Sequence, residues 1–285
     1  MASEDDLNGL DLPEFGFLPF DLYVIAKWNP ASPLSIMQQK KQLVEEWIKL
    51  GKYGRREYLG RIPLPEEIPS NVPQNLLTPK ERAHDGQIER TLFIRTWYGD
   101  PSDPASQEKA DDDYAHLVEV ISSEYGEMGL MMDEFFIFDE KEEFSSSSLL
   151  STQSSDVEFS DGVAIPRPGC MPSYVLAALM HCPDQIEGNR VENLHDLPSA
   201  EDVDGRQMLL VLVADRKACE EGWVLHLAIN HRGQVLPFRI RNGADWVSAS
   251  YGNWSDGQQL TENTQNPEAD MEMYMDHGGG GCGWD

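Results

Sequence analysis

The amino-acid sequence predicts an α/β fold in which a mixed sheet has helices packed on it, with a single main domain and an N-terminal helical extension. Between residues 91 and 241, runs rich in β-branched and aromatic residues alternate with segments of helical periodicity. The last two runs flank the turn HRGQ, which predicts an antiparallel hairpin. The sheet is therefore not expected to be purely parallel.

The N-terminal extension is predicted to contain one amphipathic helix, over about 36–50. Ser35 and Gln38 have the spacing of a capping box, and Gly51 follows as a stop. The apolar face consists of Leu43, Val44, Trp47 and Ile48. The acidic residues 1–20 before this helix are expected to form an extended arm, whose aromatic side chains dock on the body.

A proline-rich segment separates this helix from the core. Pro63, Pro65, Pro69 and Pro73 favour an extended linker, because each ring fixes φ and restricts the preceding residue. The sequence from Thr78 to Glu81 then predicts a short capped helical turn. We expect residues 1–85 to form the extension and 86–255 the α/β core.

The core elements follow in order. Strands are predicted at 91–97, 134–138, 208–214, 223–229 and 235–241, and helices at 111–125, 172–181 and 216–221. A flexible insertion is expected near 141–156, since the run KEEFSSSSLLSTQSS is rich in serine. The polar stretch 184–206 is interpreted as a loop, and 256–285 as an acidic, Gly-rich mobile tail.

Charge and cysteine content exclude several classes of function. The net charge of −28 opposes binding to nucleic acid and to anionic membranes, so neither is expected as a partner. No apolar run is long enough to cross a bilayer, and the start MASEDDLNGL lacks the features of a secretory signal. Four scattered cysteines do not form a disulfide framework. A reducing, cytoplasmic location is expected.

Three charged residues are candidates for a ligand site at the strand ends. Arg95 and Arg239 lie in apolar strands, where an arginine is costly unless it is paired. Asp215 follows a buried strand, and it is expected first of all to cap the helix 216–221, with Gly222 as its stop. The arginines either line an anion or carboxylate pocket or form internal ion pairs, for example with Asp215 or Asp100.

The remaining side chains that could carry chemistry are interpreted as structural or as part of a solvated surface. Cys219 and His226 do not by their spacing supply a nucleophile with its base, so no catalytic residue is assigned. The acidic clusters 111–113 and 133–143 lack the spacing of a calcium loop, and His277 with Cys282 falls short of a zinc site. No nucleotide, hydrolase or metalloprotease motif occurs. We therefore expect neither a metal nor a cofactor.

An ordered set of short motifs spans residues 90–255: TLFIRTW, EFFIFDE, DVEFSDGV, LLVLVADRKACEEGWVLHLAI and FRIRNGADWVSASYGN. This set resembles a microbial family of domains of unknown function, in which a strand ends in Arg-Thr, a V-A-D turn follows, and Phe-Arg precedes a Trp…Asn close. The matching positions are Arg95, Thr96, Asp161, Gly162, Ala214, Asp215, Ala218, Phe238, Arg239, Trp246 and Asn253. The resemblance implies an α/β fold and names no substrate.

Two functions from different classes are compatible with these patterns. The first is a non-catalytic interaction or accessory module, whose basic amphipathic segment 36–62 docks on the acidic body or binds a protein partner. The alternative is a small-molecule-binding protein or an enzyme, with an anion or carboxylate pocket formed by Arg95, Asp215 and Arg239. The absence of known catalytic motifs favours the first.

Overall fold

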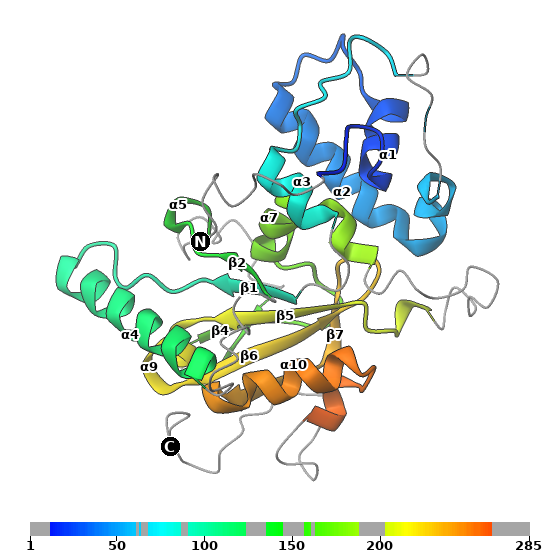
Figure 1. Cartoon of the computed structure of the whole chain (residues 1–285). Helices are drawn as coiled ribbons and strands as arrows, with labels where there is room; N and C mark the ends of the chain where they lie inside the picture. The colour runs from blue at the N-terminus through cyan, green and yellow to red at the C-terminus, as the bar shows by residue number, and fades with distance from the viewer. Residues whose placement is uncertain are drawn as a thin grey trace. The chain divides into compact units, whose positions relative to one another are not determined.

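The computed structural model describes residues 12–60, 63, 68–86, 91–123, 135–144, 157–160, 163–187 and 203–263 (Figure 1). Contacts between residues divide the chain into two compact units. Unit 1 comprises Met1–Glu89, Ala178–Arg206 and His231–Gly233. Unit 2 comprises Arg90–Ala177, Gln207–Asn230 and Gln234–Asp285. Each unit is thus assembled from three separate stretches of chain, while the boundaries expected near 85 and 255 stay predictions.

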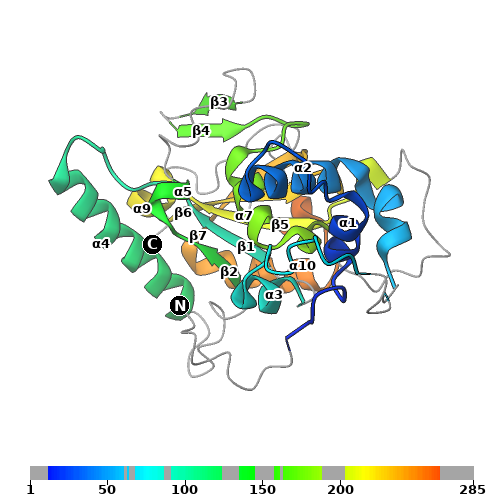
Figure 2. The same cartoon turned by 90° about the horizontal axis from the view of Figure 1, so that it is seen from above.

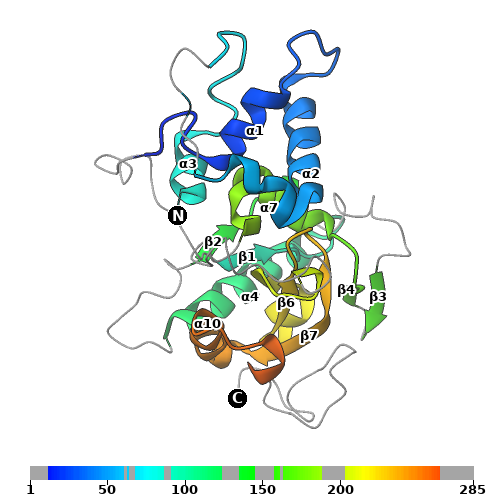
Figure 3. The same cartoon turned by 90° about the vertical axis from the view of Figure 1, so that its right-hand side faces the viewer.

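Unit 1 is helical in the part of the chain that the structure describes. Its elements are α1 (Pro19–Lys27), α2 (Ile36–Arg55), the 3₁₀ helix η2 (Arg56–Tyr58), α3 (Pro79–Asp85) and the 3₁₀ helix η6 (Pro183–Glu187). The division between the units falls within α7 (Ser173–His181). Figure 3 shows α1 and α2 joined by a loop at their upper ends.

The predicted capping of α2 and α3 is confirmed. Ser35 Oγ accepts a hydrogen bond from the N–H of Gln38, whose side chain accepts from the N–H of Ser35. Thr78 and Glu81 form the same reciprocal pair at the start of α3. Gly51 interrupts α2 with a φ of 64°, so the helix continues beyond the predicted stop only through a kink.

An aromatic cluster forms the centre of unit 1. Trp47 of α2 contacts the rings of Phe20 and Tyr23 on α1, with centroids 6.0 Å and 5.3 Å away. Tyr58 packs edge-on against both Tyr23 and Trp47. Phe20 thus packs on α2 of the extension itself, which is not the body on which the N-terminal aromatics were expected to dock, and α1 begins at Pro19, inside the segment predicted to be an extended arm.

Unit 2 is built on a five-stranded mixed sheet of order β2-β1-β5-β6-β7, which confirms the predicted α/β fold. The strands are β1 (Thr91–Arg95), β2 (Phe135–Phe138), β5 (Leu209–Ala214), β6 (Trp223–Ile229) and β7 (Val235–Gly243). β1 lies parallel to β2 and β5, whereas β5, β6 and β7 are antiparallel neighbours. Gly233, with a φ of 75°, makes the turn of the predicted β6–β7 hairpin.

Three helices pack on the sheet of unit 2 (Figure 1): α4 (Pro104–Ser123), α9 (Arg216–Glu221) and α10 (Val247–Ser255). They bury apolar side chains in one core with the strands. Its helical members include Tyr114, Leu117, Ile121, Ala218, Cys219 and Val247, and its strand members include Phe93, Phe135, Leu210, Leu212, Val224 and Ile240. α4 begins at Pro104, well before the predicted 111. The prediction missed these first turns because their side chains form no buried apolar face before Ala110.

Several described elements were not predicted, or were predicted differently. The antiparallel pair β3 (Val157–Ser160) and β4 (Val163–Pro166) forms a second small sheet, which Figure 2 shows apart from the five-stranded one. The short helix α5 (Lys141–Phe144) lies where the insertion was expected to begin, and 145–156 is outside the described residues. The predicted loop from 184 is wrong for Asp184 to Glu187, which are helical and buried.

Candidate functional site

Arg95 lies at the carboxyl end of β1, and its guanidinium is held within unit 2. Nη2 donates to Asp111 Oδ1 at 2.6 Å and to the Ala110 carbonyl at 3.1 Å, while Nε donates to the Trp97 carbonyl at 2.9 Å. The rings of Tyr98 and Tyr114 each lie with their centroids 4.4 Å from the guanidinium carbon. The internal ion pair, one of two predicted roles, is thus formed with Asp111 instead of Asp215 or Asp100.

Asp215 follows β5 and performs two structural roles. Its Oδ1 accepts from the Ala218 N–H at 3.1 Å, so it caps α9 as predicted, and Gly222 ends the helix with a φ of 77°. The same carboxylate accepts from both terminal nitrogens of Arg241, with Nη1 2.9 Å from Oδ1. Arg241 is fully buried, and this bidentate pair neutralises its charge.

Arg239 lies two residues before Arg241 on β7 and has a different position in the sheet. Its Nη1 donates to the Pro166 carbonyl at 2.9 Å. Arg239 stands opposite Leu227 of β6, whereas Arg241 stands opposite Leu225. Leu225 in turn pairs with Val213, near the end of β5 and two residues before Asp215. The strand register therefore brings Arg241 to Asp215, and the contacts of the three predicted site residues lead to different partners.

Sequence reasoning missed Arg241, although a signal was available. Residues two apart in a strand point to the same face, so the argument that singled out Arg239 applied equally to Arg241. What the sequence did not contain was the register of β7 against β6. That register is set by the hairpin around Gly233 and by a bulge between Leu227 and Ile229.

The Cys219 thiol on α9 and the His226 imidazole on β6 have structural roles. Cys219 is buried on α9, and burial raises the pKa of its thiol to about 12, so it remains protonated. His226 is fully buried on β6, where its Nδ1 lies 3.0 Å from the Val224 carbonyl. That distance identifies Nδ1 as the protonated ring nitrogen. Neither group is arranged as an activated nucleophile or base.

Two carboxylates of the acidic cluster 111–113 form ion pairs with basic side chains of the protein. Asp111 binds Arg95, and Asp113 forms an ion pair with Lys109 one turn away. Within the described ranges, no three His, Cys, Asp or Glu side chains are grouped to hold a metal ion. Asp133, His277 and Cys282 lie outside those ranges.

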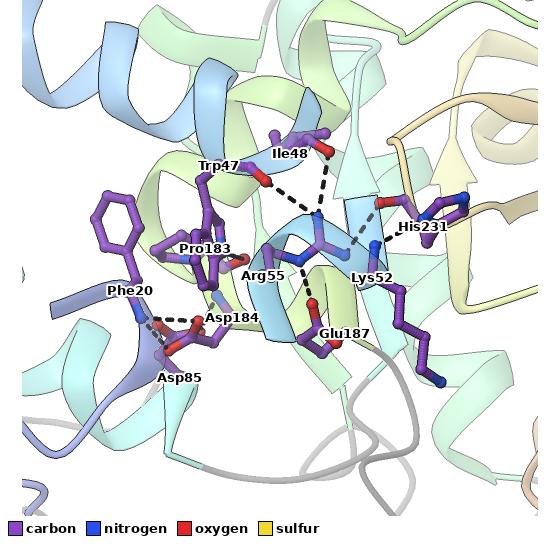
Figure 4. Close-up of polar contacts among 10 residues, drawn as sticks. All are labelled: Phe20, Trp47, Ile48, Lys52, Arg55, Asp85, Pro183, Asp184, Glu187 and His231. Atoms are coloured by element: carbon purple, nitrogen blue, oxygen red, sulfur yellow. Dashed lines mark hydrogen bonds and ion pairs between the residues drawn. The ribbon is translucent and has the colours of Figure 1, made fainter. Parts of the chain in front are cut away.

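A second polar cluster, which the sequence reasoning missed, surrounds Arg55 in unit 1 (Figure 4). The guanidinium is fully buried and forms an ion pair through Nε with Glu187. Nη1 donates to the carbonyls of Trp47 and Ile48 at 3.1 Å and 3.2 Å, and Nη2 donates to the His231 carbonyl at 3.0 Å. The charge is therefore balanced by one carboxylate and three backbone dipoles.

Asp184 and Asp85 extend this cluster toward α1 (Figure 4). Both oxygens of Asp184 accept from the Phe20 N–H, at 3.1 Å and 3.2 Å. The N–H of Asp184 donates to Asp85 Oδ1 at 2.8 Å. These bonds satisfy an N–H in the first turn of α1, and they join the ends of α1, α3 and η6. The cluster therefore holds separate stretches of the chain together.

His231 binds α2 through a backbone contact. Its Nδ1 accepts from the Lys52 N–H at 2.7 Å, and its Nε2 lies 2.6 Å from Asp204 Oδ1. Because Nδ1 is an acceptor, the ring proton is on Nε2 and the imidazole is neutral. Burial lowers the pKa of His231, and this effect outweighs the opposing influence of Asp204. The neutral ring is the form that fits the contact.

The basic segment 36–62 divides into a buried and an exposed part. Lys40, Lys52 and Arg55 are buried, and Lys40 donates to Glu81 at 3.2 Å. The apolar face of α2, with Trp47 at its centre, is also buried in unit 1. The segment was expected to dock on the body or to bind a partner, but its apolar face and three of its basic side chains are buried within unit 1. A signal for Arg55 existed, because it continues the helical face of Trp47 and Ile48.

Exposed apolar side chains gather where α2 begins. Leu34, Ile36 and Met37 have exposed fractions of 40%, 55% and 61%. Among the described residues six large apolar side chains are exposed, and these three lie within four positions of one another. They belong to the loop that joins α1 to α2 and to the first turn of α2, at the upper end of both helices in Figure 3. We define the α1–α2 patch as these three side chains together with the exposed lysines that flank them in the chain, Lys27 at the end of α1 and Lys41 in α2.

Comparison with protein-family models, with curated proteins and with solved structures finds no match for this chain.

Proposed function

We propose that this protein is a non-catalytic interaction or accessory module that binds a protein partner through the α1–α2 patch. The observation that carries the proposal is the clustered exposure of Leu34, Ile36 and Met37. Single exposed apolar residues are ordinary on protein surfaces, whereas a contiguous group is typical of an interaction site. Covering such side chains with a partner removes apolar area from water, at about 25 cal/mol per Å².

Arg95 and Asp215, which suggested a ligand pocket, are bound to other groups of the protein, and this favours an interaction module over a ligand-binding protein. Arg95 binds Asp111, and Asp215 binds both Arg241 and the end of α9. Side chains with such internal bonds serve the fold, and breaking those bonds to bind a ligand would cost several kcal/mol. In the described part of the segment 36–62, the exposed large apolar side chains are Ile36 and Met37, at its amino-terminal end.

A reducing intracellular location is part of the proposal. Cys182 and Cys219 are free thiols, and both are buried. Among the described residues, no helix has the length and apolarity needed to span a bilayer. These observations agree with a partner that is met in the cell interior.

Site-specific photocrosslinking tests the proposal. A photoreactive phenylalanine analogue is placed at position 36 in one protein and at exposed position 119 of α4 in another, and both are irradiated in extract of the source cells. We expect position 36 to give a discrete adduct that position 119 lacks. The partner identified from that adduct is then purified and titrated against the intact protein.

The double variant Ile36→Asp with Met37→Asp is the decisive control. Acidic residues in the first turn of a helix are favourable, so the variant should fold with unchanged stability. Loss of binding by the purified partner to this variant, with binding kept by Ala115→Asp on α4, supports the proposal. Equal binding to both variants, or identical adducts from both crosslinking positions, would show that the patch is not the site.

A further inference from the structure

We infer that the partner of the α1–α2 patch presents an acidic, amphipathic segment, whose apolar side chains cover Leu34, Ile36 and Met37 while its carboxylates meet Lys27 and Lys41. This inference rests on the proposed function and adds the chemistry of the partner. It follows from the charge of this part of the chain, from the two exposed lysines that make no ion pair among the described residues, and from the hydrogen bonds that shape the loop.

The charge of the patch is opposite to that of the whole protein. The 23 residues between Asp21 and Glu45 contain no Asp or Glu, although the full chain has 50 acidic residues among 285. The same interval contains Lys27, Lys40 and Lys41. The stretch of chain that carries the patch is therefore basic on a protein of net charge −28, and it favours a partner surface of negative charge.

Two of these lysines are available for intermolecular contacts. Lys40 is buried against Glu81, but Lys27 and Lys41 are exposed. Within the described part of the chain, neither Lys27 nor Lys41 has an ion-pair partner, whereas the next exposed lysine, Lys49, lies 3.8 Å from Glu45. Lys41 is four residues after Met37 in α2, so the two side chains share a helix face. A cation thus lies next to the apolar group.

The loop that carries the patch is fixed by its own hydrogen bonds. Asn29 Oδ1 accepts from the Ala31 N–H at 3.0 Å, and Ser32 Oγ accepts from the Leu34 N–H at 3.3 Å. The reciprocal Ser35–Gln38 pair then defines the first turn of α2. Since these bonds order the backbone beforehand, a partner loses less conformational entropy on binding.

A protein segment fits these observations better than an anionic bilayer. Two exposed lysines contribute only about 1 kcal/mol each near an anionic membrane. A bilayer is wide, so it also meets acidic residues elsewhere on a protein of net charge −28. A single helix or strand of a partner covers the patch alone, and repulsion from charges farther than about 8–10 Å is screened at physiological salt.

Binding of designed peptides to the intact protein tests this chemistry. The probe is a fluorescein-labelled amphipathic peptide of about five helical turns, with leucines on one face and glutamates on the other. The matched peptide carries lysine at every glutamate position. We expect the glutamate peptide to bind with a micromolar Kd by fluorescence anisotropy, to weaken as NaCl is raised, and the lysine peptide not to bind.

Two sets of variants locate the binding. Lys27→Glu combined with Lys41→Glu should weaken the glutamate peptide at least about tenfold, as should Ile36→Asp with Met37→Asp. Lys109→Glu reverses an exposed lysine on α4 and should leave the Kd unchanged. Binding that is equal for the two peptides, or insensitive to Lys27 and Lys41, would overturn the inference.

The remaining outcomes separate this inference from the proposed function. If position 36 crosslinks a specific partner whose contact segment is basic or uncharged, the inference fails while the proposed function stands. If no position-specific partner is found, the proposed function itself fails. Sedimentation with phosphatidylserine vesicles, abolished by Ile36→Asp with Met37→Asp and absent with phosphatidylcholine vesicles, would replace the protein partner by a membrane and contradict both.

Discussion

Arg55 carries its charge in a place from which water is excluded. Burial lowers the pKa of the guanidinium, and the adjacent Glu187 carboxylate opposes that effect. Removal of one partner from a buried pair leaves an uncompensated charge, so Glu187→Ala should destabilise the protein by about 3–5 kcal/mol. Denaturation by urea, followed by circular dichroism, measures the loss.

The matched control for that variant is Glu45→Ala on α2. Glu45 pairs with Lys49 at 3.8 Å on the surface, where an ion pair contributes roughly 0–1 kcal/mol. A loss for Glu187→Ala no greater than that of Glu45→Ala would mean that water reaches Arg55, and that the buried pair does not stabilise unit 1.

Asp215 can be divided into its two roles by a pair of variants. Asp215→Asn keeps an oxygen that can cap α9 but leaves Arg241 without a carboxylate, and we expect a loss of about 3 kcal/mol. Asp215→Ala also removes the cap and should lose about 1 kcal/mol more. Thermal and urea unfolding of both proteins measure the difference.

Equal stability of the two Asp215 variants would indicate that the cap contributes nothing beyond the ion pair. Glu220→Gln serves as the surface reference, because Glu220 binds Arg216 at 3.0 Å on the exposed side of α9. It should change the free energy of unfolding by less than about 1 kcal/mol.

Roles that depend on local sequence were predictable at the residue scale, and pairings were not. Asp215 as a cap and Gly222 as a stop follow from the spacing within one turn of helix. The partners Arg241 and Asp111 depend on strand register and on where α4 begins. The environment of Arg55 depends on residues more than 100 positions away, such as Glu187, which no local pattern contains.

Gly51 shows how one element is constrained by another part of the same unit. Its φ of 64° disfavours any other residue, and a Cβ added there would lie 2.7 Å from the His231 ring. Gly51→Ala should therefore displace the ring, break its bond from the Lys52 N–H, and cost at least about 3 kcal/mol. The unfolding free energy in urea measures this cost.

Gly60→Ala is the matched control for Gly51→Ala. Gly60 has a similar φ of 72°, but a Cβ there meets no atom within 4 Å. It should cost about 1 kcal/mol, from the backbone alone. Equal losses for the two variants would show that His231 yields without penalty, which would contradict the tight contact.

Elements with strong local signals were predictable, and elements formed by long-range burial were not. α2, α9 and the strands β5 and β6 combine clear periodicity with caps or turns. α1 has no clear apolar stripe of its own; it is stabilised by Phe20 and Tyr23 against Trp47. α10 likewise contributes only Val247 to the sheet core as a fully buried member.

At the scale of the whole molecule, acid should destabilise the fold through two identified groups. Burial raises the pKa of Glu81, but His181, Lys40 and the Thr78 N–H together lower it to about 2. The lowered pKa of His231 favours the neutral ring. The stability contributed by His231 is present above pH 6.5 and is lost below it, and that of Glu81 is present above pH 4.5 and is lost toward pH 2.

Denaturation in urea at about pH 7, about pH 5.5 and about pH 3 should therefore give progressively smaller unfolding free energies. Glu81 contributes on the order of 3 kcal/mol at neutral pH by this linkage. Glu81→Gln should be less stable than the natural protein at pH 7, and the gap between the two should narrow as the pH falls from 4.5 toward 2. A constant gap between the two proteins would rule out the role of Glu81.

The net charge of −28 predicts a response to salt that is opposite to that of a protein held by surface ion pairs. From about 0.01 M to about 0.15 M NaCl the Debye length falls from about 30 Å to about 8 Å, and repulsion among the acids is screened. Tm, measured by scanning calorimetry, should rise over this range. A falling Tm would indicate that attractive surface pairs outweigh the repulsion.

The assembly of unit 1 from distant stretches affects how the protein is made. Residues up to Glu89 include α1, α2 and α3, yet Arg55 and Lys52 bind His231, which is synthesised about 140 residues later. At roughly 5–20 residues per second, the ribosome delivers that residue on the order of 10 s after the first helices emerge. During this interval Arg55 lacks Glu187 and the His231 carbonyl, so the buried environment of its guanidinium is completed only when those later stretches have been synthesised.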